Sequence, residues 1–382
     1  MGKVEIVATS TFGLEAIVAQ EIRDLGFDDI KVENGRVTFI GDLDAIPRAN
    51  LWLRTADRVF VKMGEFKALT FDQLFEKTKA LPWEKWIPKD GKFPIYKAKS
   101  VKSKLFSLSD CQSIVKKAVV ERLKSSYSTD WFKETGGEYP IQVSLLKDVA
   151  SLLIDTSGVG LHKRGYREYG NDAPIKETLA AALVILSRWK PPREFIDPLC
   201  GSGTIAIEAA MIGKNIAPGL QRSFVSEEWT QLPQDLWKRA RAQAMGAIEV
   251  EKDFKILASD IDGRALSQGR TNALKAGVDD CVFFQRLPVQ ELRSKKKYGV
   301  IITNPPYGER LGKEKEILAL YKDMGKVFRN LDSWSYFIIT SHPEFEKYFE
   351  QRSDKNRKLY NGRILTYLYQ YFGKLPPRRN NK

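Results

Sequence analysis

The chain has 382 residues, of which 43% are hydrophobic and 29% are charged, and its formal net charge is +14. This length predicts two or three domains with cores of their own, and the longest fully apolar run, residues 179–186, is far shorter than the ~20 residues that a membrane-spanning helix needs. The excess of Lys and Arg favours a polyanionic partner such as a nucleic acid, although a basic surface can also serve solubility alone.

The first 65 residues carry strand and helix patterns in the order β-α-β-β-α-β. An Asn34-Gly35 pair inside an alternating stretch is a strong signal for a hairpin turn. This order predicts a ferredoxin-like α+β domain over residues 1–65. The expected elements are a strand at 4–8, a helix at 13–26, two strands within 30–40, a partly helical stretch at 42–53 and a strand at 58–66.

A second α/β unit is expected over residues 66–165. Its predicted elements are helices at 71–81 and 108–123 and strands at 93–100, 139–148 and 149–158. Lys97 and Lys99 lie on the first of these strands, in a lysine-rich stretch that continues to Lys104. Such a stretch is either a solvated charge run or a phosphate contact.

From residue 166 to residue 382 strands alternate with helices of ten to eighteen residues, which predicts a doubly wound, mainly parallel, Rossmann-like sheet. Ligands on such sheets bind at the carboxyl ends of strands, where the strand order reverses. The expected strands are 194–197, 256–260, 282–285, 299–304, 335–340 and 364–372, and the expected helices are 203–212, 263–277, 314–330 and 343–352.

The first strand of this domain ends in "DPLCGSGT", residues 197–204. Gly201 and Gly203 allow a tight turn and a close approach to a ligand, and the helix that follows offers free backbone N–H groups. The loop also fits a loose dinucleotide pattern, but no acid follows about twenty residues later, which disfavours a nicotinamide dehydrogenase. Asp197 precedes the turn, so its carboxylate is suited to a cationic ligand.

Asp260 ends the next expected strand. An acid at this place in such a fold can accept hydrogen bonds from both hydroxyls of a ribose, and Ile261 can flank an adenine face. The alternative for Asp260 is a helix N-cap, a role that Asp262 fills better.

The stretch "VIITNPPYGERL", residues 300–311, takes a buried strand directly into Asn304-Pro305-Pro306-Tyr307. The exocyclic amine of a nucleobase is a poor nucleophile, and methylating it requires acceptors that hold both N–H groups and aim the lone pair at the methyl group. The side-chain oxygen of Asn304 and the carbonyl of Pro305 are suited to this, Pro306 stiffens the loop, and Tyr307 offers a face for an extruded base. The simpler interpretation is a proline-rich loop with a surface tyrosine.

Three dispersed cysteines and only two histidines indicate neither a disulfide framework nor a metal site, so we expect a reduced, cytoplasmic, metal-free protein. Cys200 lies beside the glycine turn without a neighbouring histidine, which disfavours a nucleophilic role. The linker "HKRGYR" holds Lys163, Arg164 and Arg167, and Arg310 follows the Asn304 loop; these cations are candidates for RNA contact or are simply solvated.

Taken together, "DPLCGSGT" and "NPPYGERL" resemble class I S-adenosylmethionine-dependent amino-methyltransferases. The stretches "GLHKRGYREYGNDAPIKETLAAALV" and "IEAAMIGKNIAPGL" narrow the resemblance to bacterial THUMP-domain RNA methyltransferases, the group with the guanine-N2 methylase of 23S ribosomal RNA. The resemblance covers nearly the whole chain. It implies a ferredoxin-like domain at 1–65, a THUMP domain at 66–165 and a methyltransferase domain at 166–382.

The resemblance implies S-adenosylmethionine as donor and RNA, ribosomal or transfer, as substrate. The target amine would be held by Asn304 to Tyr307. The donor would be held by Asp197, Pro198, Cys200, Gly201, Ser202, Gly203, Thr204, Asp260 and Ile261. The chain departs from the family after the strand at 282–285, where an acid for the adenine amine is often found: Pro288 stands there, which leaves backbone atoms or Gln290 for adenine.

Two alternatives remain open at this stage. The same tetrapeptide loop can hold the N6 amine of adenine in DNA or RNA. The chain can also be an RNA-binding assembly factor that has lost methyltransferase activity. The intact glycine loop disfavours this alternative, and the Pro288 departure favours it.

Overall fold

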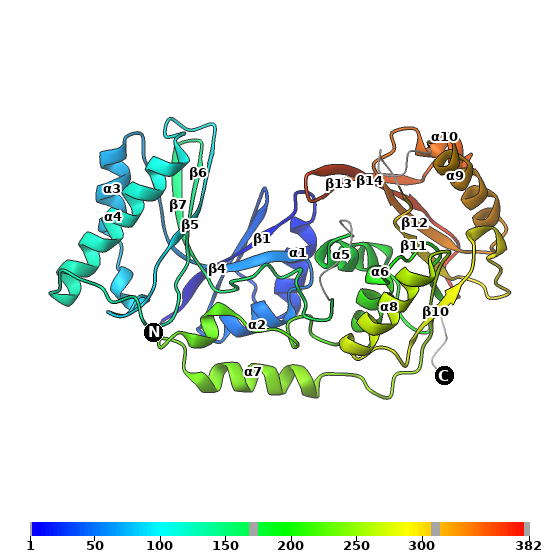
Figure 1. Cartoon of the computed structure of the whole chain (residues 1–382), viewed down its shortest axis with the longest axis horizontal. Helices are drawn as coiled ribbons and strands as arrows, with labels where there is room; N and C mark the ends of the chain where they lie inside the picture. Colours follow the sequence, from blue (N-terminus) through cyan, green and yellow to red (C-terminus); the bar gives the residue numbers. More distant parts are fainter. Residues whose placement is uncertain (1, 168–174, 307–313, 378–382) are drawn as a thin grey trace. The chain divides into compact units, whose positions relative to one another are not determined.

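The computed structural model describes residues 2–167, 175–306 and 314–377 (Figure 1). Its contacts form two compact units, each described by itself. Unit 1 comprises Met1–Ser10, Val18–Leu161 and Arg222–Gln243, and unit 2 comprises Thr11–Ile17, His162–Gln221 and Ala244–Lys382.

The N-terminal part of the chain contains seven strands and four α-helices among its described residues. They are β1 (Val4–Ser10), α1 (Glu15–Asp24), β2 (Ile30–Glu33), β3 (Arg36–Gly41), α2 (Ala45–Trp52), β4 (Ala56–Lys67), α3 (Phe71–Lys79), the 3-10 turn η1 (Trp83–Lys85), β5 (Ile95–Val101), α4 (Leu108–Tyr127), β6 (Ile141–Leu146) and β7 (Val149–Asp155). The segment at 222–243 adds the 3-10 turn η2 (Val225–Glu228) and most of α7 (Gln234–Gly246).

One seven-stranded sheet runs through unit 1 in the order β2-β3-β1-β4-β7-β6-β5. The order of its first four strands confirms the ferredoxin-like prediction. The predicted hairpin also forms, since β2 pairs with β3 and Gly35 takes the positive φ of 75° that its turn requires. The sheet continues into the second predicted domain because β4 and β7 pair in antiparallel fashion. The domain boundaries at 65 and 165 stay predictions.

Unit 2 contains a second seven-stranded sheet. Its elements are α5 (Glu177–Ser187), β8 (Phe195–Asp197), α6 (Thr204–Gly213), β9 (Ile256–Asp260), α8 (Gly263–Ala276), β10 (Val282–Arg286), the 3-10 turn η3 (Val289–Glu291), β11 (Val300–Thr303), α9 (Glu314–Arg329), β12 (Ser335–Thr340), α10 (Phe345–Phe349), β13 (Lys355–Asn361) and β14 (Ile364–Tyr371).

The strand order of this sheet is β10-β9-β8-β11-β12-β14-β13. The first five strands are parallel, and β14 alone runs antiparallel to its neighbours β12 and β13, which confirms the prediction of a doubly wound, mainly parallel sheet. The chain runs from β8 outward to β9 and β10 and then returns to the other side of β8 as β11. The order therefore reverses between β8 and β11, where such sheets bind their ligands.

Each face of this sheet packs on its own apolar core. One core joins residues of α5, α6 and α8 to Phe337 and Ile339 of β12, and the other joins residues of α9 and α10 to Ile301 and Ile338. Helix α8 has the ends that its sequence predicts: Asp262 caps it by accepting a hydrogen bond of 2.8 Å from the Arg264 N–H, and Gly277 ends it with a φ of +70°. Two α-helices and one strand were not predicted from the sequence, namely α5, α7 and β13.

Candidate active site

Three polar side chains stand at the carboxyl ends of adjacent strands of the unit 2 sheet. Asp197 is the last residue of β8, Asp260 is the last residue of β9, and Asn304 follows β11 directly. Because β8 pairs in parallel with both β9 and β11, the three residues share one edge of the sheet. This is the edge at which the strand order reverses.

The glycine loop after β8 is bound to the end of β9. The carboxylate of Asp260 accepts a hydrogen bond of 2.8 Å from the Gly201 N–H and another of 3.0 Å from the Asp262 N–H. The Cys200 N–H donates to the Ser259 carbonyl at 2.9 Å. These bonds hold the loop and the Asp260 carboxylate together in one arrangement.

The two glycines of the loop have different surroundings. Gly201 has a φ of +50°, and a Cβ added there would meet no atom within 4 Å, so it faces open space. Gly203 has a φ of +81°, and a Cβ there would lie 2.7 Å from the ring of Phe284. The structure thus adds a second reason for a glycine at 203, since Phe284 of β10 packs against its backbone.

The rest of the loop is mostly buried. Pro198, Cys200 and Thr204 are buried, and Ser202 is partly exposed, with its carbonyl accepting a bond of 3.3 Å from the Asn272 side chain. Burial, with the nearby charges of Asp197 and Asp260, raises the pKa of the Cys200 thiol far above its usual value. A thiol held neutral is a weak nucleophile, in line with the prediction that Cys200 is not one.

Asp197 joins the end of β8 to the end of β11. Its side chain is 1% exposed and accepts hydrogen bonds from the Thr303 hydroxyl at 2.9 Å and from the Leu199 N–H at 3.4 Å. Burial raises the pKa of Asp197 to about 7, the charge of Asp260 adds to this, and the Thr303 bond opposes it. Asp197 is therefore a buried acid that titrates near neutrality beside the glycine loop.

The loop after β11 is hydrogen-bonded to a side chain of α9. Pro305 is buried, while Asn304 and Pro306 are partly exposed. The hydroxyl of Tyr321, itself 0% exposed, donates a hydrogen bond of 3.0 Å to the Pro306 carbonyl and lies 3.1 Å from the hydroxyl oxygen of Thr340. Tyr307 and Arg310 lie outside the described residues.

Four residues around this loop were not singled out from the sequence: Thr303, Tyr321, Thr340 and His342. The ring of His342 meets the ring of Tyr321 edge-on, with 5.6 Å between the centroids, and its Nδ1 accepts a bond of 3.2 Å from the Glu344 N–H. The only available signal was position, since Thr303 precedes Asn304 and His342 comes two residues after the end of β12.

Beside Asp260, the side chain of Ile261 is 62% exposed, as a face for a planar ring would be. The Arg286 side chain donates to the Ile261 carbonyl at 3.0 Å, and the Leu287 N–H donates to the Asp260 carbonyl at 3.2 Å. Gln290 was a candidate for adenine recognition. Its amide nitrogen donates to the Asp323 carboxylate at 2.9 Å, and its role toward adenine stays a prediction.

Two of the three linker cations, Arg164 and Arg167, have different surroundings from those predicted. Arg164 is 2% exposed, and its guanidinium pairs with the buried carboxylate of Glu208 at 3.2 Å, to which the Tyr166 hydroxyl also donates. The prediction that Arg164 binds RNA is therefore wrong, because no surface of this side chain is left for a phosphate.

Arg167 also turns inward. It pairs with Glu177 at 3.3 Å and donates to the hydroxyl of Thr204, the first residue of α6. Through the bond to Thr204, Arg167 contacts the residue that directly follows the glycine loop. Lys163, in contrast, is exposed.

Lys97 and Lys99 lie in unit 1, on the edge strand β5. Both are exposed, and neither forms an ion pair with any residue in the described parts of the chain. Partial burial and the charges of Lys99 and Arg58 lower the pKa of Lys97.

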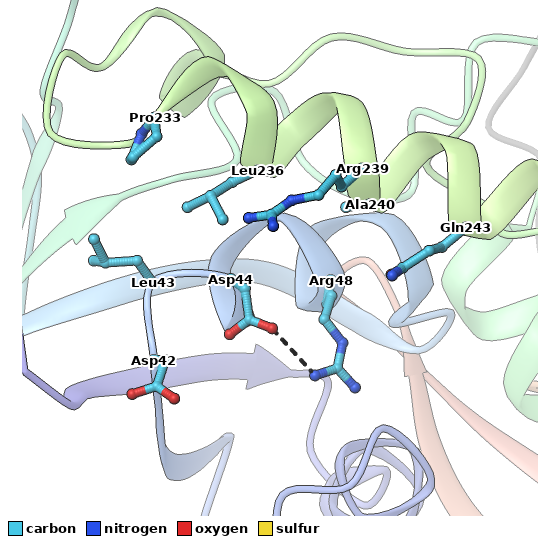
Figure 2. Close-up of a pocket in the computed structure, with 9 residues that line it drawn as sticks. All are labelled: Asp42, Leu43, Asp44, Arg48, Pro233, Leu236, Arg239, Ala240 and Gln243. Atoms are coloured by element: carbon cyan, nitrogen blue, oxygen red, sulfur yellow. Dashed lines mark ion pairs between the residues drawn. The ribbon is translucent and has the colours of Figure 1, made fainter.

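A separate hollow of about 520 Å³ lies in unit 1, between the α2 region and α7 (Figure 2). Asp44 and Arg48, both on the α2 side of the hollow, form an ion pair of 3.5 Å with each other (Figure 2). The hollow is lined by Asp42, Leu43, Asp44, Arg48, Pro233, Leu236, Arg239, Ala240 and Gln243, none of which was a predicted site residue.

Among the described residues, no helix is both long and apolar enough to cross a membrane. The same part of the chain holds no group of three or more His, Cys, Asp or Glu side chains placed to bind a metal ion.

Comparisons with protein families match three successive parts of the chain. Residues 164–370 match the methyltransferase domain described as RMKL-like, residues 5–60 match the RlmL ferredoxin-like domain, and residues 68–155 match the THUMP domain.

Individual relatives cover almost the whole chain. A Bacillus subtilis protein named "Putative RNA methyltransferase YpsC" is 53% identical over 99% of this chain and 98% of its own. A solved structure from Listeria monocytogenes, described as a "predicted N6-adenine-specific DNA methylase", is 51% identical with a TM-score of 0.93, and the match covers 98% of this chain and 97% of that one. SMU.472, described as a "putative methyltransferase complexed with SAH", is 45% identical with a TM-score of 0.93 and coverage of 98% and 100%.

Proposed function

Because this chain belongs to the RMKL-like methyltransferase family, with a THUMP domain and an RlmL-type ferredoxin-like domain, we propose that it methylates an exocyclic amine of an RNA base. The proposed target is guanine N2 of 23S ribosomal RNA, and the methyl donor is S-adenosylmethionine. One observation carries the proposal: the glycine loop and Asp260 lie at the same sheet edge as Asn304, on neighbouring strands.

The residues after β8 and β9 fit the donor. Gly201 faces open space, the Asp260 carboxylate beside it retains lone pairs for ribose hydroxyls, and the exposed Ile261 suits an adenine face. Asp197 is buried, and in this proposal it supports the donor site by holding the end of β8 to Thr303. A relative described with bound SAH supports the same assignment. When bound, S-adenosylmethionine supplies a methyl group made electrophilic by its sulfonium.

The loop after β11 fits the acceptor amine. The side chain of Asn304 forms no hydrogen bond with any described residue, so its carboxamide oxygen is available to accept from a substrate N–H. The Tyr321 bond holds the Pro306 carbonyl, and in this proposal the Pro305 carbonyl is the second acceptor. Two fixed acceptors orient the amine and localise its lone pair, and this positioning accelerates the transfer without a strong base.

The RNA part of the proposal rests on charge and on relatives. The net charge of +14 favours a polyanion, and a relative at 53% identity is named as an RNA methyltransferase. In this proposal Lys97, Lys99 and Lys163 contact phosphates.

The test is to identify the product. Purified protein, S-adenosylmethionine with a labelled methyl group and unmodified ribosomal RNA would be incubated, and the digested RNA analysed by mass spectrometry. We expect N2-methylguanosine at one position, matching a mark that is missing from cells without the gene. The appearance of N6-methyladenosine instead would overturn the choice of guanine and favour adenine, in agreement with the description of the Listeria relative. No methylated nucleoside, together with no calorimetric binding of the donor, would favour an assembly factor without activity.

A further inference from the structure

The hairpin formed by β13 and β14 extends beyond the sheet edge that carries the candidate active site. The last residue of β12, Thr340, pairs with Tyr367 of β14. Because β14 runs antiparallel to β12, the three residues before Tyr367 continue past that edge, by about 10 Å at ~3.4 Å per residue. Their partners on β13 continue with them, from Leu359 to Asn361.

This projecting end lies on the side of the acceptor loop. β12 is the neighbour of β11, and Thr303 pairs with Ile338, which brings Asn304 to the level of Ile339. The Tyr321 hydroxyl is hydrogen-bonded both to the Pro306 carbonyl and to the hydroxyl of Thr340, the residue opposite Tyr367. The hairpin end is thus two strands away from the loop that would hold the target amine.

The base of the hairpin is firmly packed. Leu359, Thr366 and Leu368 are each 0% exposed, and the two leucines belong to the same core as Leu14 and Ile17. A buried base presents the hairpin end in a fixed position.

The exposed side chains at this end include cations and one aromatic ring, beside the aliphatic Ile364 and Leu365. We define the hairpin patch as Lys358, Tyr360, Arg363 and Leu365, all exposed, with Tyr360 and Leu365 opposite each other in the register. Residues 355–372 contain four cations and no acid, and none of the four forms an ion pair with a residue in the described ranges. Unpaired cations around an exposed aromatic ring are typical of surfaces that bind unpaired nucleic acid.

We propose that the hairpin patch is an RNA contact of this enzyme, with Lys358 and Arg363 on phosphates that flank the target nucleotide and Tyr360 stacked on a neighbouring unpaired base. This inference rests on the proposed function and extends it, because it assigns substrate binding to the methyltransferase unit itself. It also implies that the target lies in a stretch whose bases can be unstacked.

The experiment measures RNA affinity separately from turnover. Wild-type protein, the Lys358→Ala/Arg363→Ala variant and the Tyr360→Leu variant would be titrated with a short unpaired RNA and with DNA of the same sequence, over a range of salt concentrations. Lys295→Ala/Lys326→Ala removes the same charge from exposed positions near the opposite edge of the sheet and serves as the matched control. Thermal melting and donor calorimetry check that each variant is folded.

Loss of two phosphate contacts should weaken RNA binding roughly tenfold and lower the salt slope by about 1.4, at ~0.7 per contact. Tyr360→Leu should weaken it at least about fivefold, and Tyr360→Phe, which keeps the ring, should restore it. RNA affinities equal to those of the Lys295/Lys326 control, or losses confined to DNA, would overturn the proposal even if the wild type methylates RNA. A wild type that binds RNA through the patch but produces no methylated nucleoside would leave the patch standing and remove the proposed function.

Discussion

The hydroxyl of Tyr321 donates a hydrogen bond of 3.0 Å to the carbonyl of Pro306 and so fixes the loop after β11 to the helix beneath it. The loop must present Asn304 and the Pro305 carbonyl at defined positions, and a displacement of about 1 Å at a reacting centre can cost about a hundredfold in rate.

Replacing this hydroxyl tests its role. Tyr321→Phe should lower kcat by about ten- to a hundredfold and leave the donor Kd unchanged, as measured by steady-state kinetics and calorimetry. Tyr336→Phe is the matched control, since the Tyr336 hydroxyl donates to the Phe328 carbonyl inside the same core. Both variants should lose about 1 kcal/mol of stability. Equal kcat values for the two would show that the Tyr321 bond serves stability alone.

Asn304→Ala removes the proposed acceptor for one N–H of the target amine. We expect the rate constant of single turnover to fall by about a hundredfold or more, because a fixed polar contact to the reacting group is lost. Donor binding, measured by calorimetry, should stay near the wild-type value. Asn330→Ala makes the same substitution at an exposed position at the end of α9 and serves as the matched control. Methylation by Asn304→Ala at the wild-type rate would remove Asn304 from the site.

Gly201→Ala tests whether the space at the glycine loop belongs to the donor. The positive φ costs a non-glycine residue about 1–2 kcal/mol, and the new methyl group would enter the open space beside Asp260. Donor affinity should therefore fall well beyond the change in stability. Gly277→Ala carries the same backbone penalty, with a φ of +70° and no atom within 4 Å, but lies at the end of α8. A donor Kd that is unchanged in Gly201→Ala would place the donor elsewhere.

Asp197 should make stability depend on pH. Its folded pKa, about 7, lies above the ordinary value of 3.8, so between these pH values the folded protein retains a proton that the unfolded chain has released. The free energy of unfolding should therefore fall as pH rises from about 4 to about 7 and then level off, by on the order of 4 kcal/mol in total. Denaturant unfolding of wild type and Asp197→Asn at several pH values measures the difference, and parallel curves would contradict it.

Arg164 is expected to matter for folding. Breaking a buried ion pair leaves an uncompensated charge, so Arg164→Met should cost about 3–5 kcal/mol, measured by denaturant unfolding. Adding Glu208→Gln removes that charge and keeps an acceptor for the Tyr166 hydroxyl, so the double variant should recover part of the loss. Arg239→Met breaks an exposed pair with Asp235 and should cost less than about 1 kcal/mol. A specific loss of RNA affinity with unchanged stability in Arg164→Met would reverse this assignment.

The sequence predicts those elements for which the hydrophobic pattern and the turn or cap residues indicate the same helix or strand. The Asn34-Gly35 hairpin, the α8 caps and the short apolar strands that end in Asp197, Asp260 and Thr303 are examples, because local chemistry alone specifies each of them. Strand ends at one edge then bring the candidate site together, so Asp260 and Asn304 could be chosen from the order of elements.

The elements and contacts that were missed depend on tertiary partners. α5 is buried on nearly all sides, which removes the helical period from its sequence, and β13 is rich in Lys and Asn and forms because β14 pairs with it. Arg164 and Lys163 are neighbours with the same charge in the same linker, yet one is buried against Glu208 and the other is exposed. Only the packing of α6 separates them. Tyr321 falls on the apolar stripe of α9, where its hydroxyl gives no sequence signal.

The antiparallel pairing of β4 with β7 has a practical consequence for dissecting the molecule. Residue 65 lies inside β4, so a protein fragment that begins or ends there would be cut within a strand. It would expose unpaired backbone N–H and C=O groups at a sheet edge. Such fragments should self-associate when expressed alone, whereas a fragment containing all seven strands should melt in a single cooperative step. The ferredoxin-like and THUMP portions would then behave as one folding unit.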